Sequence, residues 1–323
     1  MDEFSFINSI KPSTYRQSSL IKGIGDDAAV IRQTAEDIVT AVDVFVENVH
    51  FSRETMDPFH VGYRALAANL SDMAAMGATP TYFLVGAVVP KNWSSDELHE
   101  IFKGMRHLAD KYAVDLIGGD TVSGSELTLS VTVFGKVRKD KARYRSAARP
   151  GDIVFVTGTL GDSQAGFHIL TNNQQSESNS YFIKKHRMPT PQIDFANALS
   201  GINRLSLNDI SDGLANEARE IAEASKVTIN LLDEAIPTSS NFNQFPLSLQ
   251  HQWKYFGGED FELIGTVAED EWARVEEAAE KTNTLITKVG NVTLNEHDKH
   301  GEVYLFQGVE KQVLKKEGYT HLK

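Results

Sequence analysis

The sequence predicts an α/β fold with two domains, on three observations. The chain has 323 residues, more than one domain usually contains. Apolar runs of strand length alternate with segments of helical periodicity in both halves, which is typical of α/β layering. A basic connector, 136–149, separates the halves and ends at Pro150-Gly151-Asp152. We therefore expect domains at 1–148 and 149–323.

In the first half, most elements carry a periodic signal of their own. Apolar residues recur with helical spacing after the β-rich run that ends at Asp43. Ser94 and Glu97 have the spacing of a capping box, which predicts the start of a second helix. The expected elements are strands at 38–42, 82–89, 115–117 and 127–134, and helices at 61–74 and 98–112.

The second half repeats the mixture of strands and helices. A strand leads into Gly158-Thr159-Leu160-Gly161, which matches neither the Walker A nor the dinucleotide-binding fingerprint, so we interpret it as a structural turn. The polar stretch 171–180 is typical of an exposed loop. The expected elements are strands at 153–156, 285–289 and 303–306, and helices at 214–222 and 272–281.

Composition excludes several classes of protein. With 32 basic and 44 acidic side chains the net charge is -12, a poor match to the phosphate backbone of nucleic acid. The absence of cysteine excludes disulfides, thiolate metal sites and cysteine nucleophiles. No apolar run approaches the ~20 residues of a membrane span, and the first residues lack a basic, apolar signal segment. We expect a cytoplasmic protein that binds neither nucleic acid nor membrane.

Acidic residues recur beside glycine, serine or a second acid where apolar runs end. Two carboxylates about 4 Å apart repel by roughly 4 kcal/mol at an effective dielectric near 20, so a cluster needs bound cations or raised pKa values. Oxygen ligands without cysteine favour Mg²⁺, which indicates an enzyme that handles phosphate. The six places are Gly25-Asp26-Asp27, Val42-Asp43, Ser71-Asp72, Gly118-Gly119-Asp120-Thr121, Asp209-Ile210-Ser211-Asp212-Gly213 and Gly257-Gly258-Glu259-Asp260.

Each place also has a structural interpretation. Glycine and aspartate are common in turns, and Ser211 or Asp212 has the right position to cap the following helix. Asp72 is harder to explain in this way, because an acid near the C-terminal end of a helix faces the negative end of its dipole. Arg145 and Arg149 are ordinary surface residues unless the acidic protein binds a polyphosphate.

Taken in order, these stretches resemble the thiamine-monophosphate kinase family, of the superfamily that includes aminoimidazole ribonucleotide synthetase. The resemblance covers essentially the whole chain. Its motifs are the six acidic places together with Val46-Glu47-Asn48-Val49-His50-Phe51, Arg64 to Ala78, Arg145-Ser146, Val156 to Ser163, Phe261-Glu262-Leu263 and Gly318-Tyr319.

The resemblance implies transfer of the γ-phosphoryl group of ATP to thiamine monophosphate. We expect no covalent phosphoenzyme, since the chain has no cysteine and its aspartate motifs contain no histidine. The resemblance also implies two α/β domains, of which the first, 1–148, binds metal and ATP and forms a shared sheet in a homodimer. It implies the following residue roles. Several Mg²⁺ ions would be held by Asp27, Asp43, Asp72, Asp120, Asp209 and Asp212, ATP by Gly119, Asp120, Arg145 and Ser211, and the thiamine substrate by His50, Glu259 and Tyr319.

The chain departs from the family pattern at three places. Ala41 and Val42 replace hydroxyl residues before Asp43, Val122 replaces a threonine, and 318–322 lacks the usual acid and aromatic residue. Three other functions remain open. They are the purine-pathway synthetase, an inert regulator that binds nucleotide and metal, and a metal-dependent phosphohydrolase, which would normally also use histidine ligands. Related enzymes that rely on cysteine or selenocysteine do not fit a chain without cysteine.

Overall fold

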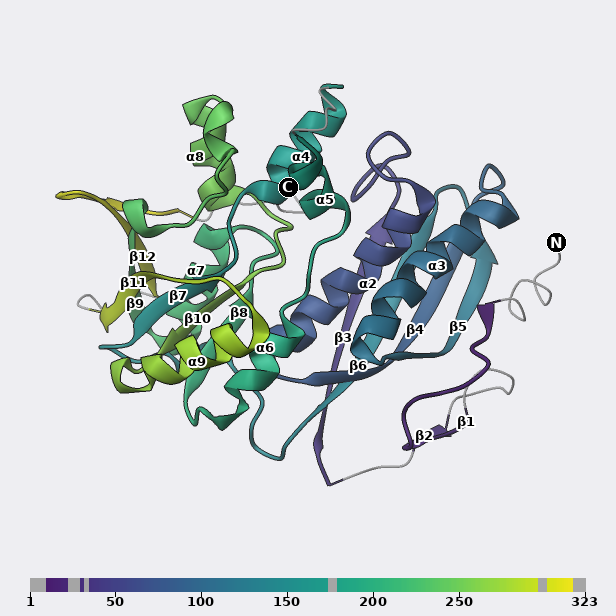
Figure 1. Cartoon of the computed structure of the whole chain (residues 1–323), viewed down its shortest axis with the longest axis horizontal. Helices are drawn as coiled ribbons and strands as arrows, with labels where there is room; N and C mark the ends of the chain where they lie inside the picture. The colour runs from purple at the N-terminus through teal and green to yellow at the C-terminus, as the bar shows by residue number, and fades with distance from the viewer. Residues whose placement is uncertain (1–9, 23–29, 32–34, 174–178, 296–300, 316–323) are drawn as a thin grey trace. The chain divides into compact units, whose positions relative to one another are not determined.

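The computed structural model describes residues 10–22, 30–31, 35–173, 179–295 and 301–315. Its contacts divide the chain into two compact units (Figure 1). Unit 1 comprises Met1–Met73 and Ala78–Asp140, and unit 2 comprises Ala74–Gly77 and Lys141–Lys323. Each unit contains a sheet with helices, which confirms the predicted α/β class. The functional boundary expected after residue 148 stays a prediction.

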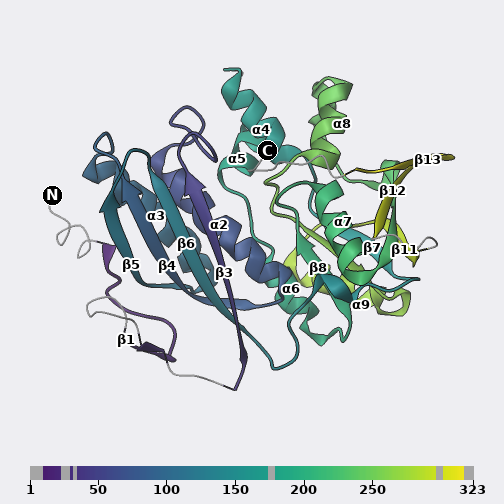
Figure 2. The same cartoon turned by 180° about the vertical axis from the view of Figure 1, so that it is seen from behind.

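The elements of unit 1 are β1 (Leu20–Lys22), β2 (Val30–Ile31), β3 (Asp37–Val46), α2 (Pro58–Ala75), β4 (Thr79–Val89), α3 (Ser95–Tyr112), β5 (Asp115–Ser123) and β6 (Thr128–Val137). Strands β1 and β2 pair antiparallel in a two-stranded sheet, and the others form a four-stranded sheet with the order β3-β6-β4-β5. Strand β6 is antiparallel to both neighbours, whereas β4 and β5 are parallel. Helices α2 and α3 cover one face of this sheet (Figures 1 and 2).

The helix layer of unit 1 depends on glycine. A Cβ atom added at Gly104 of α3 would lie 1.9 Å from the carbonyl oxygen of Phe59 in α2. The same addition at Gly62 of α2 would lie 1.8 Å from the carbonyl oxygen of Ile101. The two helix backbones are therefore in contact. The predicted capping box of α3 is confirmed, since Ser94 and Glu97 each accept the backbone N–H of the other.

The second face of the unit 1 sheet carries exposed apolar side chains. Ile38, Val42 and Val44 on β3 are 60%, 58% and 50% exposed, and Val122 on β5 is 50% exposed. On β6, by contrast, the residues that point toward the helices are buried. Strands β3 and β5 are the two edges of the sheet. In a single copy of the chain, the face opposite the helices therefore exposes apolar side chains along both edges.

The elements of unit 2 are η1 (Arg145–Ala147), β7 (Ile153–Thr157), α4 (Asp162–Thr171), α5 (Ser180–Arg187), α6 (Ile193–Ala198), η3 (Leu199–Gly201), β8 (Leu205–Asp209), α7 (Leu214–Ser225), β9 (Val227–Leu232), η4 (Asp233–Ala235), η5 (Phe242–Gln244), α8 (Leu247–Phe256), β10 (Leu263–Val267), η6 (Glu269–Glu271), α9 (Trp272–Thr282), β11 (Ile286–Leu294), β12 (Glu302–Gln307) and β13 (Glu310–Val313). The sheet order is β13-β12-β9-β11-β7-β10-β8. Only the β12–β9 pair is parallel among these described strands.

Two buried clusters hold unit 2 together. The larger packs the apolar side of α7 against the sheet, through residues such as Leu214, Ala218 and Ile221. The smaller joins α4, α5 and α8 through aromatic side chains, including Phe182 and Trp253. The loop expected over 171–180 lies partly outside the described residues. No helix in the described part of the chain is long and apolar enough to cross a bilayer.

Candidate functional site

In unit 1, His50 lies in the turn that leaves β3. Its Nδ1 atom accepts the backbone N–H of Val46 at 3.0 Å, and its ring stacks on Phe45 with centroids 5.4 Å apart. A backbone N–H is always a donor, so the neutral ring carries its proton on Nε2. The turn therefore holds His50 in a set orientation, with an N–H donor at Nε2.

Glu47 supports the same turn, and the sequence analysis did not assign it a role. Its buried carboxylate accepts Trp93 Nε1–H at 2.9 Å and the Leu127 N–H at 3.3 Å. Arg53 completes the group, since its Nε lies 3.5 Å from Glu47 Oε1 and its guanidinium lies 4.0 Å from the centre of the Trp93 ring. A single glutamate after a strand does not indicate from the sequence alone that its side chain is buried and makes these contacts.

The strand register places Asp43 and Asp120 apart within one copy of unit 1. Asp43 is opposite Val131, in a row that continues through Val85 to Gly119, so its side chain shares the helix-covered face with the buried Val131 and Val85. Asp120 belongs to the next row and projects from the other face. Strand β3, which carries Asp43, and strand β5, which carries Asp120, are three strand spacings apart, a distance of about 14 Å.

Burial and backbone contacts distinguish the environments of these residues. Burial raises the pKa of Asp43 above its ordinary value. Asp120 is exposed, and its Oδ1 accepts the N–H of Thr121 at 2.9 Å. A Cβ atom added at Gly119 would lie 2.1 Å from the Val85 carbonyl oxygen, so this position requires glycine.

Asp72 lies in the last turn of α2, as expected, and is half-buried. Its neighbours Asn69 and Ser71 are fully buried polar residues. Helix α2, which carries Asp72, covers the face of the sheet from which Asp43 projects (Figure 1). Two other predicted site residues, Asp27 and Tyr319, lie outside the described residues.

In unit 2, the two acidic motifs meet. The turn Asp209-Ile210-Ser211-Asp212-Gly213 joins β8 to α7. Backbone hydrogen bonds connect it to the loop before β10, from Ile210 N to Glu262 O at 2.7 Å, from Glu259 N to Ser211 O at 2.6 Å, and from Phe261 N to Ile210 O at 3.0 Å. The structure thus brings the predicted ATP and metal turn next to the predicted substrate residue Glu259.

The loop has the strained backbone that a close approach requires. A Cβ atom added at Gly258 would lie 2.5 Å from the carbonyl oxygen of Ser211. Glu259 and Phe261 both have left-handed backbone angles, with φ of 68° and 51°. Such conformations are unfavourable for residues with side chains and are typical of functional loops.

Glu217, in the first turn of α7, lies beneath the Asp209–Gly213 turn and was missed by the sequence analysis. Its buried carboxylate accepts the Asp212 N–H at 3.2 Å, the Ser211 hydroxyl at 3.4 Å and the side-chain amide of Asn208. Burial first, and then the charge of Asp209, raise the pKa of Glu217 to about 9.

Arg145 reaches the same group from η1. Its Nε donates to Asn208 Oδ1 at 2.9 Å, and its Nη2 lies 3.1 Å from Glu220 Oε2. Of the four residues predicted to bind ATP, Arg145 and Ser211 are therefore connected through Asn208 and Glu217. Gly119 and Asp120 belong to unit 1.

Asp260, although part of the acidic loop, has a structural role. Its carboxyl group is buried and accepts the N–H groups of Gly161 and Ser163, at 2.6 and 3.0 Å, at the start of α4. Burial raises its pKa to about 8. Gly161 itself has a φ of 85°, as expected if Gly158–Gly161 is a structural turn.

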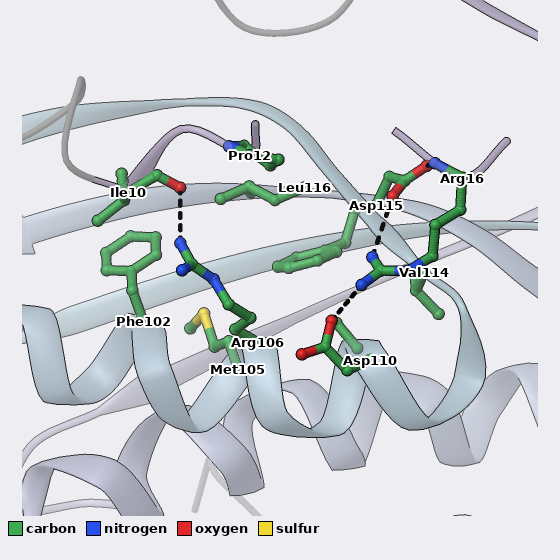
Figure 3. A pocket seen from close by; sticks show the side chains of 12 residues that line it. Ile10, Pro12, Arg16, Phe102, Met105, Arg106, Asp110, Val114, Asp115 and Leu116 are labelled. Atoms are coloured by element: carbon green, nitrogen blue, oxygen red, sulfur yellow. Dashed lines mark hydrogen bonds and ion pairs between the residues drawn. The ribbon is translucent and has the colours of Figure 1, made fainter. Parts of the chain in front are cut away.

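One pocket of unit 1 contains none of the predicted site residues (Figure 3). It lies between the segment that begins at Ile10 and the α3–β5 region, and its volume of about 40 Å³ is too small for a nucleotide. Asp115 borders it and accepts the backbone N–H groups of Arg16 and Gln17 at 2.7 and 3.0 Å. The pocket is a packing space beneath an anchored segment.

Among the described residues, no group of three or more histidine or acidic side chains is arranged to hold a metal ion by itself. The described metal candidates are divided between the units, with Asp43, Asp72 and Asp120 in unit 1 and Asp209 and Asp212 in unit 2. Their donors are all carboxylate oxygens, which suit Mg²⁺.

Comparison with known proteins gives matches along the chain. Residues 25–137 match the model for the AIR synthase related protein N-terminal domain, and residues 149–301 match the model for the C-terminal domain. The chain is 43% identical to thiamine-monophosphate kinase of Bacillus subtilis (strain 168), over 100% of both chains.

Solved structures agree with these sequence matches. Thiamine-monophosphate kinase from Stenotrophomonas maltophilia K279a superposes with a TM-score of 0.85 at 30% identity, over 94% of this chain and 96% of that chain. AaThiL complexed with AMPPCP and TMP superposes with a TM-score of 0.74 at 28% identity, over 97% and 96%.

Proposed function

Because this chain belongs to the thiamine-monophosphate kinases of the AIR synthase related family, we propose that it transfers the γ-phosphoryl group of ATP to thiamine monophosphate by direct in-line attack, with several Mg²⁺ ions. The product is thiamine diphosphate. The observation that carries the proposal is the likeness to the Bacillus subtilis kinase over the whole of both chains. The solved complex with AMPPCP and TMP supports this pair of substrates.

Phosphoryl transfer between two phosphates is mainly a problem of positioning and charge. The acceptor oxygen of thiamine monophosphate is already anionic, so no strong general base is needed. When bound, Mg²⁺ supplies charge neutralisation for the phosphates. The residues that would hold it are Asp27, Asp43, Asp72, Asp120, Asp209 and Asp212.

The described carboxylates fit this requirement by their chemistry. Burial, followed by the charges of Asp209, Glu220 and Asp212, raises the pKa of Glu217, so acidic side chains that repel one another gather at the end of β8. A cation bound there would relieve that repulsion. In unit 1, the half-buried Asp43 has a similar need.

ATP would be bound by Gly119, Asp120, Arg145 and Ser211. Gly119 presents backbone without a side chain, and Arg145 supplies a permanent positive charge to an acidic protein. Arg145 Nη2 already pairs with Glu220, which holds its guanidinium at the end of β8.

Thiamine monophosphate would be bound by His50, Glu259 and Tyr319. With Nδ1 occupied by the Val46 N–H, His50 would act as a hydrogen-bond donor through Nε2 to an acceptor atom of the substrate. It would not act as a base at that atom. Glu259 would supply an acceptor or a negative charge.

We further propose a homodimer formed through the sheet of unit 1. The exposed Val42 and Val44 lie on its uncovered face, and a second copy would bury them. Asp43 and Asp120 lie at opposite edges of one sheet. A dimer sheet would give each edge a partner from the second copy.

The test is incubation of the purified protein with Mg²⁺, ATP and thiamine monophosphate, followed by separation of the thiamine phosphates. We expect stoichiometric formation of ADP and thiamine diphosphate. Formation of ADP and inorganic phosphate alone would favour a phosphohydrolase, and absence of ATP turnover would favour an inert nucleotide-binding regulator.

A further inference from the structure

We propose that Glu217 is a positioning residue of the nucleotide site, whose carboxylate sets the geometry of Ser211, Asp212 and Arg145. The inference rests on the proposed function, which assigns those three residues to ATP and Mg²⁺. Glu217 itself is buried, with 3% of its surface exposed. It therefore acts through the residues that it holds.

The carboxylate of Glu217 connects two elements. Its Oε1 atom accepts the Asp212 N–H at 3.2 Å and the Ser211 hydroxyl at 3.4 Å, both in the turn. Its Oε2 atom accepts the side-chain amide N–H of Asn208, on β8. One side chain on α7 thus fixes the turn to the strand that precedes it.

The donor and the acceptor are determined in each hydrogen bond that links Arg145 through Asn208 and Glu217 to Asp212. The guanidinium of Arg145 can only donate, so Asn208 must turn its oxygen, Oδ1, toward Arg145 Nε at 2.9 Å. Its amide nitrogen, Nδ2, then faces position 217. Since the Asp212 N–H also only donates, position 217 needs two acceptor oxygens, which a carboxyl group provides in either protonation state and an amide does not.

Stability alone does not explain an acid at this position. Glu217 is buried, and its side-chain hydrogen bonds all go to Asn208, Ser211 and Asp212 rather than to the apolar core that packs beside α7. A polar side chain buried at this position lowers the stability of the fold relative to a well-packed apolar residue. Its hydrogen bonds to the proposed ATP and metal residues provide the reason for its place.

The experiment compares four variants of the full chain with the wild-type protein. In Glu217→Gln, an N–H₂ group opposes the Asn208 amide, and in Asn208→Asp two carboxylates oppose each other. The double variant Asn208→Asp/Glu217→Gln restores a donor opposite an acceptor at the three contacts that join Arg145, position 208, position 217 and Asp212, although the carboxylate introduced at position 208 faces Glu220, to which Asn208 Nδ2 donates at 3.4 Å in the wild type. Glu223→Gln, exposed on the same helix, is the matched control.

We expect each single variant to raise the KM for ATP about tenfold, the factor that corresponds to 1.4 kcal/mol at 25 °C. The KM for thiamine monophosphate should stay within about twofold. The double variant should recover most of the lost affinity, and Glu223→Gln should match the wild type. The melting midpoint of Glu217→Gln should stay close to the wild-type value, because the change keeps the shape of the side chain.

Three results would overturn the assignment. They are an unchanged KM for ATP in Glu217→Gln, a double variant no better than the poorer single variant, or parallel losses in both KM values and in the melting midpoint. A wild-type protein that binds MgATP but does not phosphorylate thiamine monophosphate would instead contradict the proposed function. In that case the nucleotide Kd of the same variants, measured by calorimetry, decides the role of Glu217.

Discussion

At the scale of single residues, the acidic motifs of this chain have different roles, although they look alike. Asp209, Ser211 and Asp212 surround the buried Glu217, whereas Asp260 accepts two backbone N–H groups at the start of α4. The first group concentrates charge where a cation would be useful. Asp260 is instead a helix cap.

Asp212 is the described aspartate whose replacement should be most informative. We expect Asp212→Asn to lower turnover by about two orders of magnitude, since removal of one charge-stabilising group in an active site has an effect of that size. Circular dichroism and the melting midpoint should be unchanged. Asp194→Asn, an exposed position on α6, is the control. Unchanged turnover at saturating Mg²⁺ would refute the metal role of Asp212.

Asp260 predicts a dependence of stability on pH. Its pKa is about 8 in the folded state and near 4 in the unfolded chain. The folded state therefore holds this proton more tightly, so its stabilising effect is complete below about pH 4 and is lost as the pH rises through about 8. Asp260→Asn has no proton to lose at this position. The melting midpoint of the variant minus that of the wild type should therefore increase between pH 4 and pH 8. A constant difference across that range would contradict the assignment.

At the scale of elements, the close contact of α2 and α3 depends on Gly104. In Gly104→Ala the new methyl group would meet the carbonyl oxygen of Phe59, so the helices must separate. We expect a loss of about 1–3 kcal/mol in the free energy of unfolding, measured by denaturant titration. Lys103→Ala, an exposed neighbour on α3, should be neutral. Equal stability of the two variants would show that the helices adjust without strain.

Sequence reasoning predicted the elements that have strong local signals. The capping box at Ser94 and the helical periodicity before Asp72 are confirmed by α3 and α2. Periodicity is local, so it is visible in one sequence. The prediction missed elements such as α5 and α8, because their apolar faces are short and become complete only in the aromatic cluster of unit 2.

The relations between distant elements are not readable in this way. The face from which Asp43 or Asp120 projects depends on strand register, and a shift of one residue would reverse it. Glu217 lies in Asn216-Glu217-Ala218-Arg219, which has the composition of a solvent-exposed helix surface. Its burial follows from the packing of α7 beside β8, a tertiary contact without a sequence signal.

At the scale of the whole molecule, the uncovered face of the unit 1 sheet predicts self-association. We expect a dimer by analytical ultracentrifugation, and we expect Val44→Arg to dissociate it, because a charge would be buried in the interface. Val309→Arg, at a fully exposed position of unit 2, is the matched control. A monomeric wild-type protein, or a dimer indifferent to Val44→Arg, would contradict this use of the sheet.

The activity of the whole chain is tested most directly by following the thiamine phosphates during incubation with Mg²⁺ and ATP. We predict that thiamine monophosphate is converted to thiamine diphosphate with one ADP formed for each product molecule, and that chelation of the divalent ions stops the reaction. A protein that is folded, supplied with Mg²⁺ and ATP, and still leaves thiamine monophosphate unchanged would contradict the proposed function.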